Sequence, residues 1–228
     1  MSEPEDYDVV DYWSEVKLDI VKEYLKAYST IMAARTNPSF SYVYIDGFSG
    51  PGVCIRKATR DFIPGSPLNA LNVTPPFHEY YFIDMDGGKA ERLQELCKGM
   101  DNVTVREGDC NKILIKEIFP KVDYKAYRRG ICLLDPYRMD VHWEVVEEAG
   151  KAESLELFVN FPTMDINRNA LRKDPAKITE NSARRMTAFW GDESWREQFY
   201  QEKGTLPIFD VEEEREASNL QVVNAYRE

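Results

Sequence analysis

An apolar run that ends in a glycine-rich turn constrains the fold of this chain more than any other feature. Tyr42–Ile45 is followed by Asp46 and by a turn that contains Gly47, Gly50 and Gly52. A buried strand that stops in glycines forms a nucleotide-sized crevice at the carboxyl edge of an open α/β sheet. Glycine suits this place because a Cβ atom would keep the backbone away from a ligand lying across the strand end. Taken alone, the segment could also be an ordinary glycine-rich turn.

Two common phosphate-binding motifs fit the turn poorly. Its glycines do not follow the spacing Gly-x-Gly-x-x-Gly, and no Lys-Ser or Lys-Thr pair comes after them. The sequence therefore gives only weak support to a dinucleotide fingerprint or to a P-loop.

Strand-like and helix-like segments alternate along most of the chain. The apolar patterns predict strands over 41–46, 80–84, 103–106, 131–134 and 155–159, and helices over 13–35, 66–73, 87–99, 111–119 and 141–152. Ser66, with Pro67 after it, is the expected N-cap of the second helix. This alternation indicates an α/β, Rossmann-like fold: a mostly parallel sheet with helices on both faces.

The domain organisation follows from where the alternation starts and stops. We expect an N-terminal helical segment over 1–40 that packs on a core over 41–162. Residues 163–205 break the pattern and predict a helical insertion, and 206–228 would return to the core with a helix over 211–228. That helix ends without a capping signal, so we expect the chain to be a truncated piece of a longer protein.

Composition excludes several classes of protein. No apolar run approaches the roughly 20 residues of a membrane span, and the N-terminus is acidic, unlike a secretory signal. We therefore expect a cytoplasmic protein that does not associate with membranes. The four cysteines are scattered and there are only two histidines, so we predict no metal site.

The charge balance bears on nucleic-acid binding. The net charge is −11, from 40 acidic and 29 basic residues, which opposes a broad basic face. A nucleic-acid substrate is thus conceivable but unsupported by net charge. A local basic cleft is still open, and several arginines occur in the second half: Arg128, Arg129, Arg138, Arg168, Arg172, Arg184 and Arg185.

Acidic residues follow the predicted strands next to the glycine turn. Asp84 ends the second strand, where a carboxylate can accept both ribose hydroxyls of a nucleoside-bearing cofactor. The alternative is that Asp84 caps the following helix, and Asp86 competes for either role. Asp109 follows the third strand and could accept the adenine amino group, or cap the helix that begins near Asn111.

The fourth strand ends in Asp135-Pro136-Tyr137. A proline after the aspartate removes a backbone donor and leaves nearby carbonyls free to accept from a substrate. A carboxylate and a carbonyl together can hold an amine, and Tyr137 can stack on a planar target. Taken alone, the segment would more often be an Asp-Pro turn that ends the strand. Because it follows three other strands that end in polar residues, we favour the interpretation that it binds a substrate.

The order of these elements resembles a class I methyltransferase that uses S-adenosylmethionine (SAM). Asp-x-Phe-x-Gly-x-Gly, at residues 46–52, is similar to the first motif of such enzymes, and Asp135-Pro-Tyr137 resembles the Asp-Pro-Pro-Tyr element of amino-methyltransferases without its second proline. The resemblance implies methyl transfer to an amino nitrogen. Catalysis would then be mainly orientation, because the cofactor brings an already reactive methyl group.

Further motifs resemble the three-Cys-motif partner (TcmP) family over most of residues 13–228. These motifs are Asp46-Gly-Phe-Ser-Gly-Pro-Gly52, Gly65-Ser-Pro67, Phe82-Ile-Asp-Met-Asp86, Gly108-Asp-Cys-Asn111, Leu134-Asp-Pro-Tyr137, Asn160-Phe-Pro162 and Phe189-Trp-Gly-Asp192. The resemblance implies a Rossmann-like methyltransferase fold and a three-Cys-motif radical-SAM-type protein as partner. Family members continue into an antiparallel hairpin, so we expect the C-terminal hairpin to be missing here.

The leading hypothesis assigns roles to particular residues. The expected cofactor-binding residues are Asp46, Phe48, Gly50, Gly52, Asp84, Asp109 and Cys110. The expected catalytic residues are Asp135, Pro136 and Tyr137. Two alternatives stay open: a catalytically idle partner module that keeps the fold, and a different nucleotide-using Rossmann enzyme.

Overall fold

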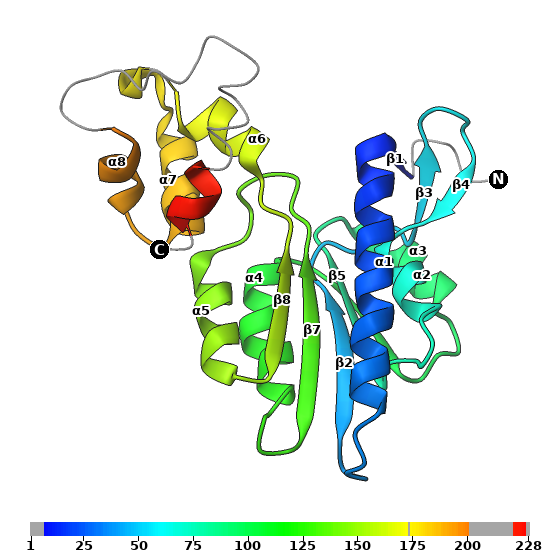
Figure 1. Cartoon of the computed structure of the whole chain (residues 1–228). Coiled ribbons are helices and arrows are strands. Elements are labelled where there is room, and N and C mark those ends of the chain that lie inside the picture. The colour runs from blue at the N-terminus through cyan, green and yellow to red at the C-terminus, as the bar shows by residue number, and fades with distance from the viewer. Residues whose placement is uncertain (1–6, 173, 201–220, 227–228) are drawn as a thin grey trace. The chain divides into compact units, whose positions relative to one another are not determined.

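The computed structural model of the chain describes residues 7–172, 174–200 and 221–226 (Figure 1). The chain divides into two compact units, Met1–Leu134 with Glu148–Phe158, and Asp135–Glu147 with Val159–Glu228. The second unit thus begins directly after the fourth predicted strand, whereas the sequence placed the start of an insertion at residue 163.

The first unit is built on a parallel sheet. Among the described residues, five strands lie in the order β6-β5-β2-β7-β8. Pairing is parallel between β2 and β5, β2 and β7, and β5 and β6. The strands are β2 (Ser41–Asp46), β5 (Glu79–Asp84), β6 (Val103–Glu107), β7 (Arg128–Leu134) and β8 (Leu155–Val159). The five strands predicted from the sequence are confirmed, and so is the α/β fold class.

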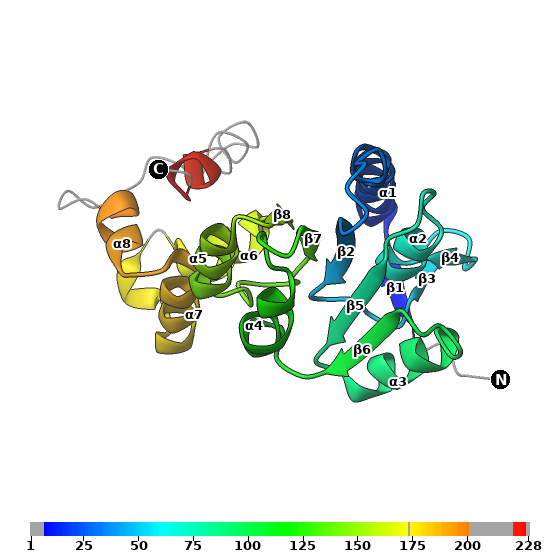
Figure 2. The same cartoon turned by 90° about the horizontal axis from the view of Figure 1, so that it is seen from below.

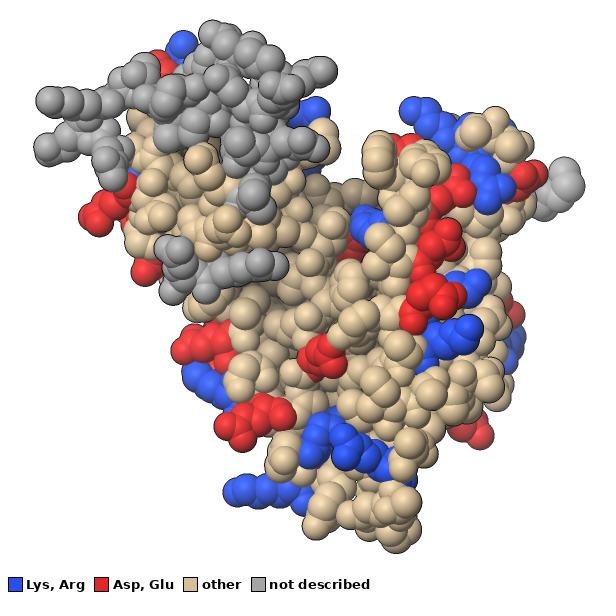
Figure 3. All heavy atoms as spheres, viewed as in Figure 1, with Lys and Arg blue, Asp and Glu red and all other residues tan. Residues whose placement is uncertain are grey.

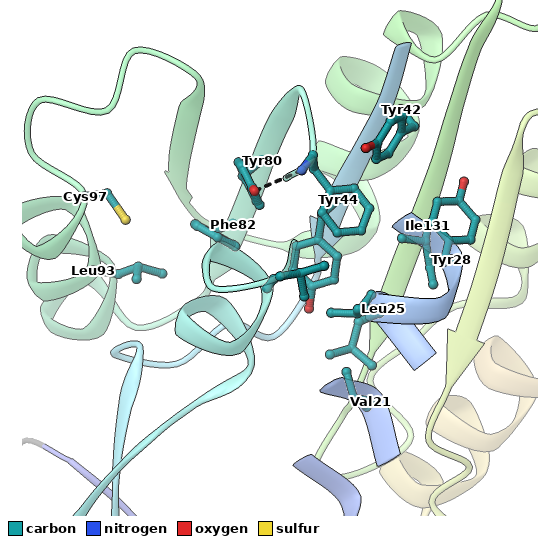
Figure 4. Packing of buried hydrophobic residues seen from close by; sticks show 14 residues of the cluster. Val21, Leu25, Tyr28, Tyr42, Tyr44, Tyr80, Phe82, Leu93, Cys97 and Ile131 are labelled. Carbon is teal, nitrogen blue, oxygen red and sulfur yellow. Dashed lines mark hydrogen bonds between the residues drawn. The ribbon is translucent and has the colours of Figure 1, made fainter. Parts of the chain in front are cut away.

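Alternation of side chains gives this sheet two buried faces. Tyr42 and Tyr44 of β2 join the same hydrophobic cluster as Tyr80 and Phe82 of β5, and all four are buried. Figure 4 shows these side chains together with Leu25 and its neighbours from the helix before β2. The intervening residues of each strand are buried as well, because successive side chains point to opposite faces of a sheet.

Helices cover both faces of the sheet, and in Figure 2 α1 and α2 lie on one side of the strands and α4 on the other. The helical segments of the first unit are α1 (Tyr12–Ala33), α2 (Ser66–Leu71), α3 (Gly87–Leu96), α4 (Cys110–Ile113), a π-helical turn (Leu114–Ile118) and a 3₁₀ turn (Phe119–Lys121). A further helix, α5 (Trp143–Ala152), begins in the second unit and ends in the first.

One helix start differs from the prediction. Gly65 is the N-cap of α2 and makes no side-chain capping bond, while Ser66 is the first helical residue. A Cβ atom on Gly65 would lie 3.0 Å from the carbonyl oxygen of Gly52. The cap position therefore needs a glycine, because the start of α2 touches the glycine turn.

A second, smaller sheet was not predicted. It has the order β1-β3-β4 among the described residues, with β1 (Asp8–Val10), β3 (Val53–Arg56) and β4 (Phe62–Pro64). β1 runs parallel to β3, and β3 pairs antiparallel with β4. The sequence placed a loop where β3 and β4 form a hairpin. This small sheet brings the N-terminal residues beside the glycine turn.

The second unit is mainly helical. It contains α6 (Thr163–Asp165), a π-helical turn (Ile166–Ala170), a 3₁₀ turn (Pro175–Lys177), α7 (Glu180–Trp190), α8 (Ser194–Phe199) and a helix over 221–226. Met186, Phe189 and Trp195 are buried in it. The Tyr226 ring lies 5.1 Å from that of Phe189 and 4.9 Å from that of Phe161. Of the C-terminal helix predicted over 211–228, only 221–226 lie within the described residues, and they belong to this unit.

No helix in the described ranges is long and apolar enough to cross a membrane.

The hydrophobic cluster predicts a large effect of truncating Leu25. This side chain is 1% exposed and packs in the cluster from α1. We expect Leu25→Ala to lower the free energy of unfolding by about 2 to 5 kcal/mol, because it leaves a cavity. Denaturation by urea, followed by circular dichroism, measures this. Glu23→Ala on the exposed side of the same helix is the control and should change stability by less than about 0.5 kcal/mol. Equal losses from both variants would contradict the packing.

Candidate functional site

The carboxylate of Asp46 holds the glycine turn together from inside. Tyr44 Oη donates a hydrogen bond to Asp46 Oδ2 at 3.1 Å, and the backbone N–H of Phe48 donates to Oδ1 at 3.1 Å. Asp46 is completely buried, while Phe48 is half-buried. The sequence predicted that Asp46 contacts a ligand. In the structure this carboxylate is buried and these hydrogen bonds shape the turn, so its contact with a ligand stays a prediction.

The glycines of the turn are required by backbone conformation and by close neighbours. Gly50 and Gly52 have φ values of +62° and +82°, which other residues rarely adopt. A Cβ atom on Gly52 would lie 2.9 Å from a methyl carbon of Leu93 on α3, and one on Gly50 would lie 3.0 Å from Asp8 Oδ2. Gly52 therefore packs under a helix, and Gly50 lies beside an acidic side chain.

Asp84 ties the end of β5 to the glycine turn after β2. The backbone N–H of Gly50 donates to Asp84 Oδ2 at 2.7 Å, and that of Asp86 donates to Oδ1 at 2.9 Å. Asp86 is the N-cap of α3 and accepts from the N–H of Lys89 at 3.2 Å. The structure thus separates the two roles that the sequence left open, since Asp86 caps the helix and Asp84 faces the turn.

Two further charged residues lie at this place, and sequence reasoning missed them. Lys89 Nζ forms an ion pair with Asp8 Oδ1 at 2.6 Å, and each side chain is 24% exposed. Burial by itself lowers the pKa of Lys89, but the carboxylates of Asp8, Asp84 and Asp86 outweigh it, and the pKa lies above its usual value. Asp8 reaches the turn because β1 pairs with β3. No pattern in residues 7–10 indicated that pairing.

Asp109 at the end of β6 is a helix cap in the structure. Its Oδ1 accepts from the backbone N–H of Asn111 at 3.0 Å and from Asn111 Nδ2 at 3.1 Å, and Lys112 Nζ lies 3.3 Å from Oδ2. Burial raises the pKa of Asp109, but these bonds outweigh it and hold the pKa below 3.8. Cys110, the first residue of α4, is buried and leaves little surface for a ligand.

Asp135, Pro136 and Tyr137 lie in the second unit. Asn160, which follows β8 in the chain, donates from Nδ2 to Asp135 Oδ1 at 2.8 Å. Pro136 is buried, whereas Tyr137 is 77% exposed. The structure therefore brings together two polar residues that follow different strands, and it leaves the tyrosine ring on the surface.

An ion-pair network holds the segment after Tyr137. Asp165 Oδ2 accepts from the backbone N–H of Met139 at 3.0 Å and lies 3.4 Å from Arg185. Arg185 also pairs with Asp140 at 3.1 Å. In the described part of the chain, no group of three His, Cys, Asp or Glu side chains is arranged to hold a metal ion.

Because Asp8 lies close to Gly50, we predict that a methyl group at position 50 lowers the stability of the protein more than at a glycine with open space around it. Alanine in a left-handed conformation costs about 1 to 2 kcal/mol. Gly99 also has a positive φ, +85°, but no atom lies within 4 Å of its Cβ position. We expect Gly50→Ala to destabilise the protein more than Gly99→Ala in thermal or urea unfolding. Combining Gly50→Ala with Asp8→Ala in a double-mutant cycle should remove the excess. Equal effects of the two single glycine substitutions would show that Asp8 does not crowd this position.

The lowered pKa of Asp109 predicts a pH-dependent contribution to stability. The carboxyl titrates near 3.8 when unfolded and below that value when folded. Its contribution is therefore fully present above 3.8 and is lost as the pH falls through the folded value. We expect the stability difference between wild type and Asp109→Asn, measured by urea unfolding, to shrink as the solution is acidified. A difference that stays constant across this range would contradict the assignment.

No family model and no curated protein matches the chain. Among solved structures, the chain is similar to the crystal structure of protein LPL1258 from Legionella pneumophila str. Philadelphia 1, family-model DUF519. The two share 16% sequence identity over 74% of this chain and 73% of that chain, with a TM-score of 0.48. A likeness at this level assigns neither a family nor a function.

Proposed function

We propose that this chain is a SAM-dependent methyltransferase. The observation that carries the proposal is the bond of 2.7 Å from the Gly50 N–H to Asp84 Oδ2. It joins the glycine turn to an acidic strand end at the carboxyl edge of the sheet, where open α/β folds bind ligands. A carboxylate has about four acceptor positions, and Gly50 and Asp86 use two of them. Two positions remain for the neighbouring hydroxyls of a ribose.

The charge around the turn favours SAM over a cofactor that carries phosphates. Asp8, Asp84 and Asp86 contribute three carboxylates around one ammonium, that of Lys89. A negative site attracts a sulfonium with an amino-acid end and repels the pyrophosphate of NAD or the phosphates of ATP. This charge balance supports the methyltransferase over a different nucleotide-using Rossmann enzyme.

The acceptor end of the proposed reaction rests on Asp135 and its neighbours. SAM supplies a methyl group on a positively charged sulfur, so the protein has mainly to orient the acceptor nitrogen. The Asp135 carboxylate, fixed by Asn160, can accept an N–H hydrogen of an amine and can take up the proton that the nitrogen loses after methylation. Pro136 has no N–H of its own, and the exposed ring of Tyr137 offers a flat face to a planar acceptor.

Two further parts of the proposal rest on the motif resemblance alone. They are a three-Cys-motif radical-SAM-type protein as partner, and a nucleic-acid amino group as acceptor. The alternative is a partner module without activity. Cofactor binding with no methyl transfer to any acceptor, alongside co-purification with that partner, would favour the module.

The role of Asp84 predicts a specific loss of affinity for the cofactor. We expect calorimetry to show binding of SAM and S-adenosylhomocysteine to the wild-type chain, and roughly tenfold weaker binding to Asp84→Asn. A hydrogen bond to a charged group contributes about 1.5 to 3 kcal/mol, and the amide keeps an acceptor for the Gly50 N–H. Asp86→Asn removes the same charge and keeps the cap of α3, so it is the matched control and should weaken binding much less than Asp84→Asn does.

Two results would contradict this proposal. One is no binding of either compound to the intact protein. The other is equal affinity of wild type and Asp84→Asn. Tighter binding of NAD or ATP than of SAM would favour the alternative hypothesis of a different nucleotide-using Rossmann enzyme.

A further inference from the structure

A cleft of about 480 Å³ lies at the amino edge of the main sheet, where β2 and β7 begin. One wall comes from the end of α1 and the loop into β2. The other wall comes from the turn that leads into β7. The side chains that matter here are Arg35, Asn37, Phe40, Tyr124, Tyr127 and Arg129. Because the glycine turn follows the opposite end of β2, this cleft is separate from the candidate cofactor site.

Backbone bonds hold both walls in place. Asn37 closes its loop by accepting from Phe40 N at 3.0 Å and, through Oδ1, from Ser39 N at 2.9 Å. In the other wall, Tyr127 N donates to Tyr124 O at 3.1 Å. Ser41 N donates to Tyr127 O at 3.2 Å, and this bond joins the two walls. These bonds fix the two walls of the cleft relative to each other.

The backbone of Tyr127 is in an uncommon conformation. Its φ is +57°, a value that few residues other than glycine adopt. Such strain is tolerated where the surrounding structure fixes it, and it clusters at ligand sites. Here it directs the chain from the tight turn at Tyr124 into β7 and leaves both tyrosine rings about half exposed, Tyr124 at 51% and Tyr127 at 52%.

Two arginines in the cleft have no acidic partner among the described residues. Neither Arg35 nor Arg129 forms an ion pair with a carboxylate anywhere in 7–172, 174–200 or 221–226. The adjacent Arg128, by contrast, pairs with Glu79 at 2.8 Å. Figure 3 shows Lys and Arg side chains gathered at the lower end of the view, where Figure 1 places the loops before β2 and β7. The C-terminus of α1 adds only about half a negative charge, which two guanidinium groups outweigh.

One arginine is already positioned by an aromatic ring. The guanidinium carbon of Arg129 lies 3.7 Å from the centre of the Tyr124 ring. Its Nη1 donates to the carbonyl oxygens of Arg128 at 2.8 Å and Tyr124 at 3.4 Å. The guanidinium has five N–H donors, so donors remain for an anion while the stacking keeps the group in place.

From these contacts we propose that the cleft binds a nucleotide, either free or within a single RNA strand. Planar, doubly donating guanidinium groups match the geometry of a phosphate or a carboxylate. Exposed aromatic rings beside such groups provide faces on which a base stacks. The volume of the cleft suits one small ligand. An acidic peptide would use the arginines but would leave the Tyr127 ring, and the Tyr124 face that Arg129 does not cover, without a planar partner.

Equilibrium binding to the full chain tests this, with uridine 5′-monophosphate and an oligouridylate of about six nucleotides as probes. Uridine probes avoid the adenine of SAM. We expect both probes to bind, and Arg35→Gln and Tyr124→Ala each to weaken binding about tenfold, from the loss of a charged hydrogen bond and of one stacking face. Lys125→Gln removes a positive charge from the same turn without removing a cleft side chain, and should have little effect. Asp84→Asn should bind both probes as wild type does.

A probe without phosphate separates the contribution of the arginines from that of the tyrosine rings. With uridine, which has no phosphate, Tyr124→Ala should still weaken binding, and Arg35→Gln should not. Equal affinity for the mononucleotide and the oligonucleotide would identify a free nucleotide as ligand, and much tighter binding of the oligonucleotide would identify a strand.

Three results would overturn the proposal. The first is no binding of either probe at millimolar concentration. The second is an equal loss in Lys125→Gln and Arg35→Gln, which would show unspecific attraction. The third is binding of an acidic peptide in place of the nucleotide. The two cleft variants lie on opposite walls and at exposed positions, so a folding defect in one leaves the other as the test. If the wild-type chain binds the uridylate probes but does not bind SAM, the proposed methyltransferase activity is refuted and the proposal for this cleft stands.

Discussion

The carboxyl edge of the first unit depends on the hydrogen bonds that join the end of β2 to the end of β5. The ladder between these strands continues past Asp46, because Ser49 N donates to Ile83 O and Ile83 N donates to Ser49 Oγ, both at 2.9 Å. The Gly50–Asp84 bond follows one residue further on. The turn is thus an extension of the sheet, and the glycine at position 50 adopts its positive φ without the strain that a Cβ atom would add there.

A buried acid makes this arrangement rigid. Asp46 is removed from water but receives hydrogen bonds from Tyr44 and from the backbone of Phe48, which a buried carboxylate needs. Its charge also acts on the other face of the sheet. Cys132 of β7 is completely buried, and burial first, then the charge of Asp46, raises the pKa of its thiol. Asp46 is therefore part of the structure that positions Asp84, and Asp84 is the partly exposed acid of the two.

The main sheet and the position of Asp84 could be predicted because they depend on local patterns. Apolar runs that end in polar residues mark each of its strands. The small sheet could not be predicted, because β1 and β4 have three residues each, and Asp8 pairs with Cys54, far along the chain. Asp8 and Lys89 went unnoticed for that reason. The cleft at the amino edge also escaped, because Arg35 and Arg129 meet only when α1 and β7 are folded onto the same sheet.

The net charge of −11 opposes binding of anions only if the charge is evenly spread, and in the first unit it is not. β2 has six residues and spans about 20 Å at roughly 3.3 Å per residue. Asp8 and Asp84 lie past one end of this strand, whereas Arg35 precedes its other end and Arg129 pairs with Tyr42 near that end. At physiological salt the screening length is about 8 Å, so the acidic edge does not neutralise the basic one. A parallel sheet can therefore hold a cationic ligand at its carboxyl edge and an anionic one at its amino edge without competition between them.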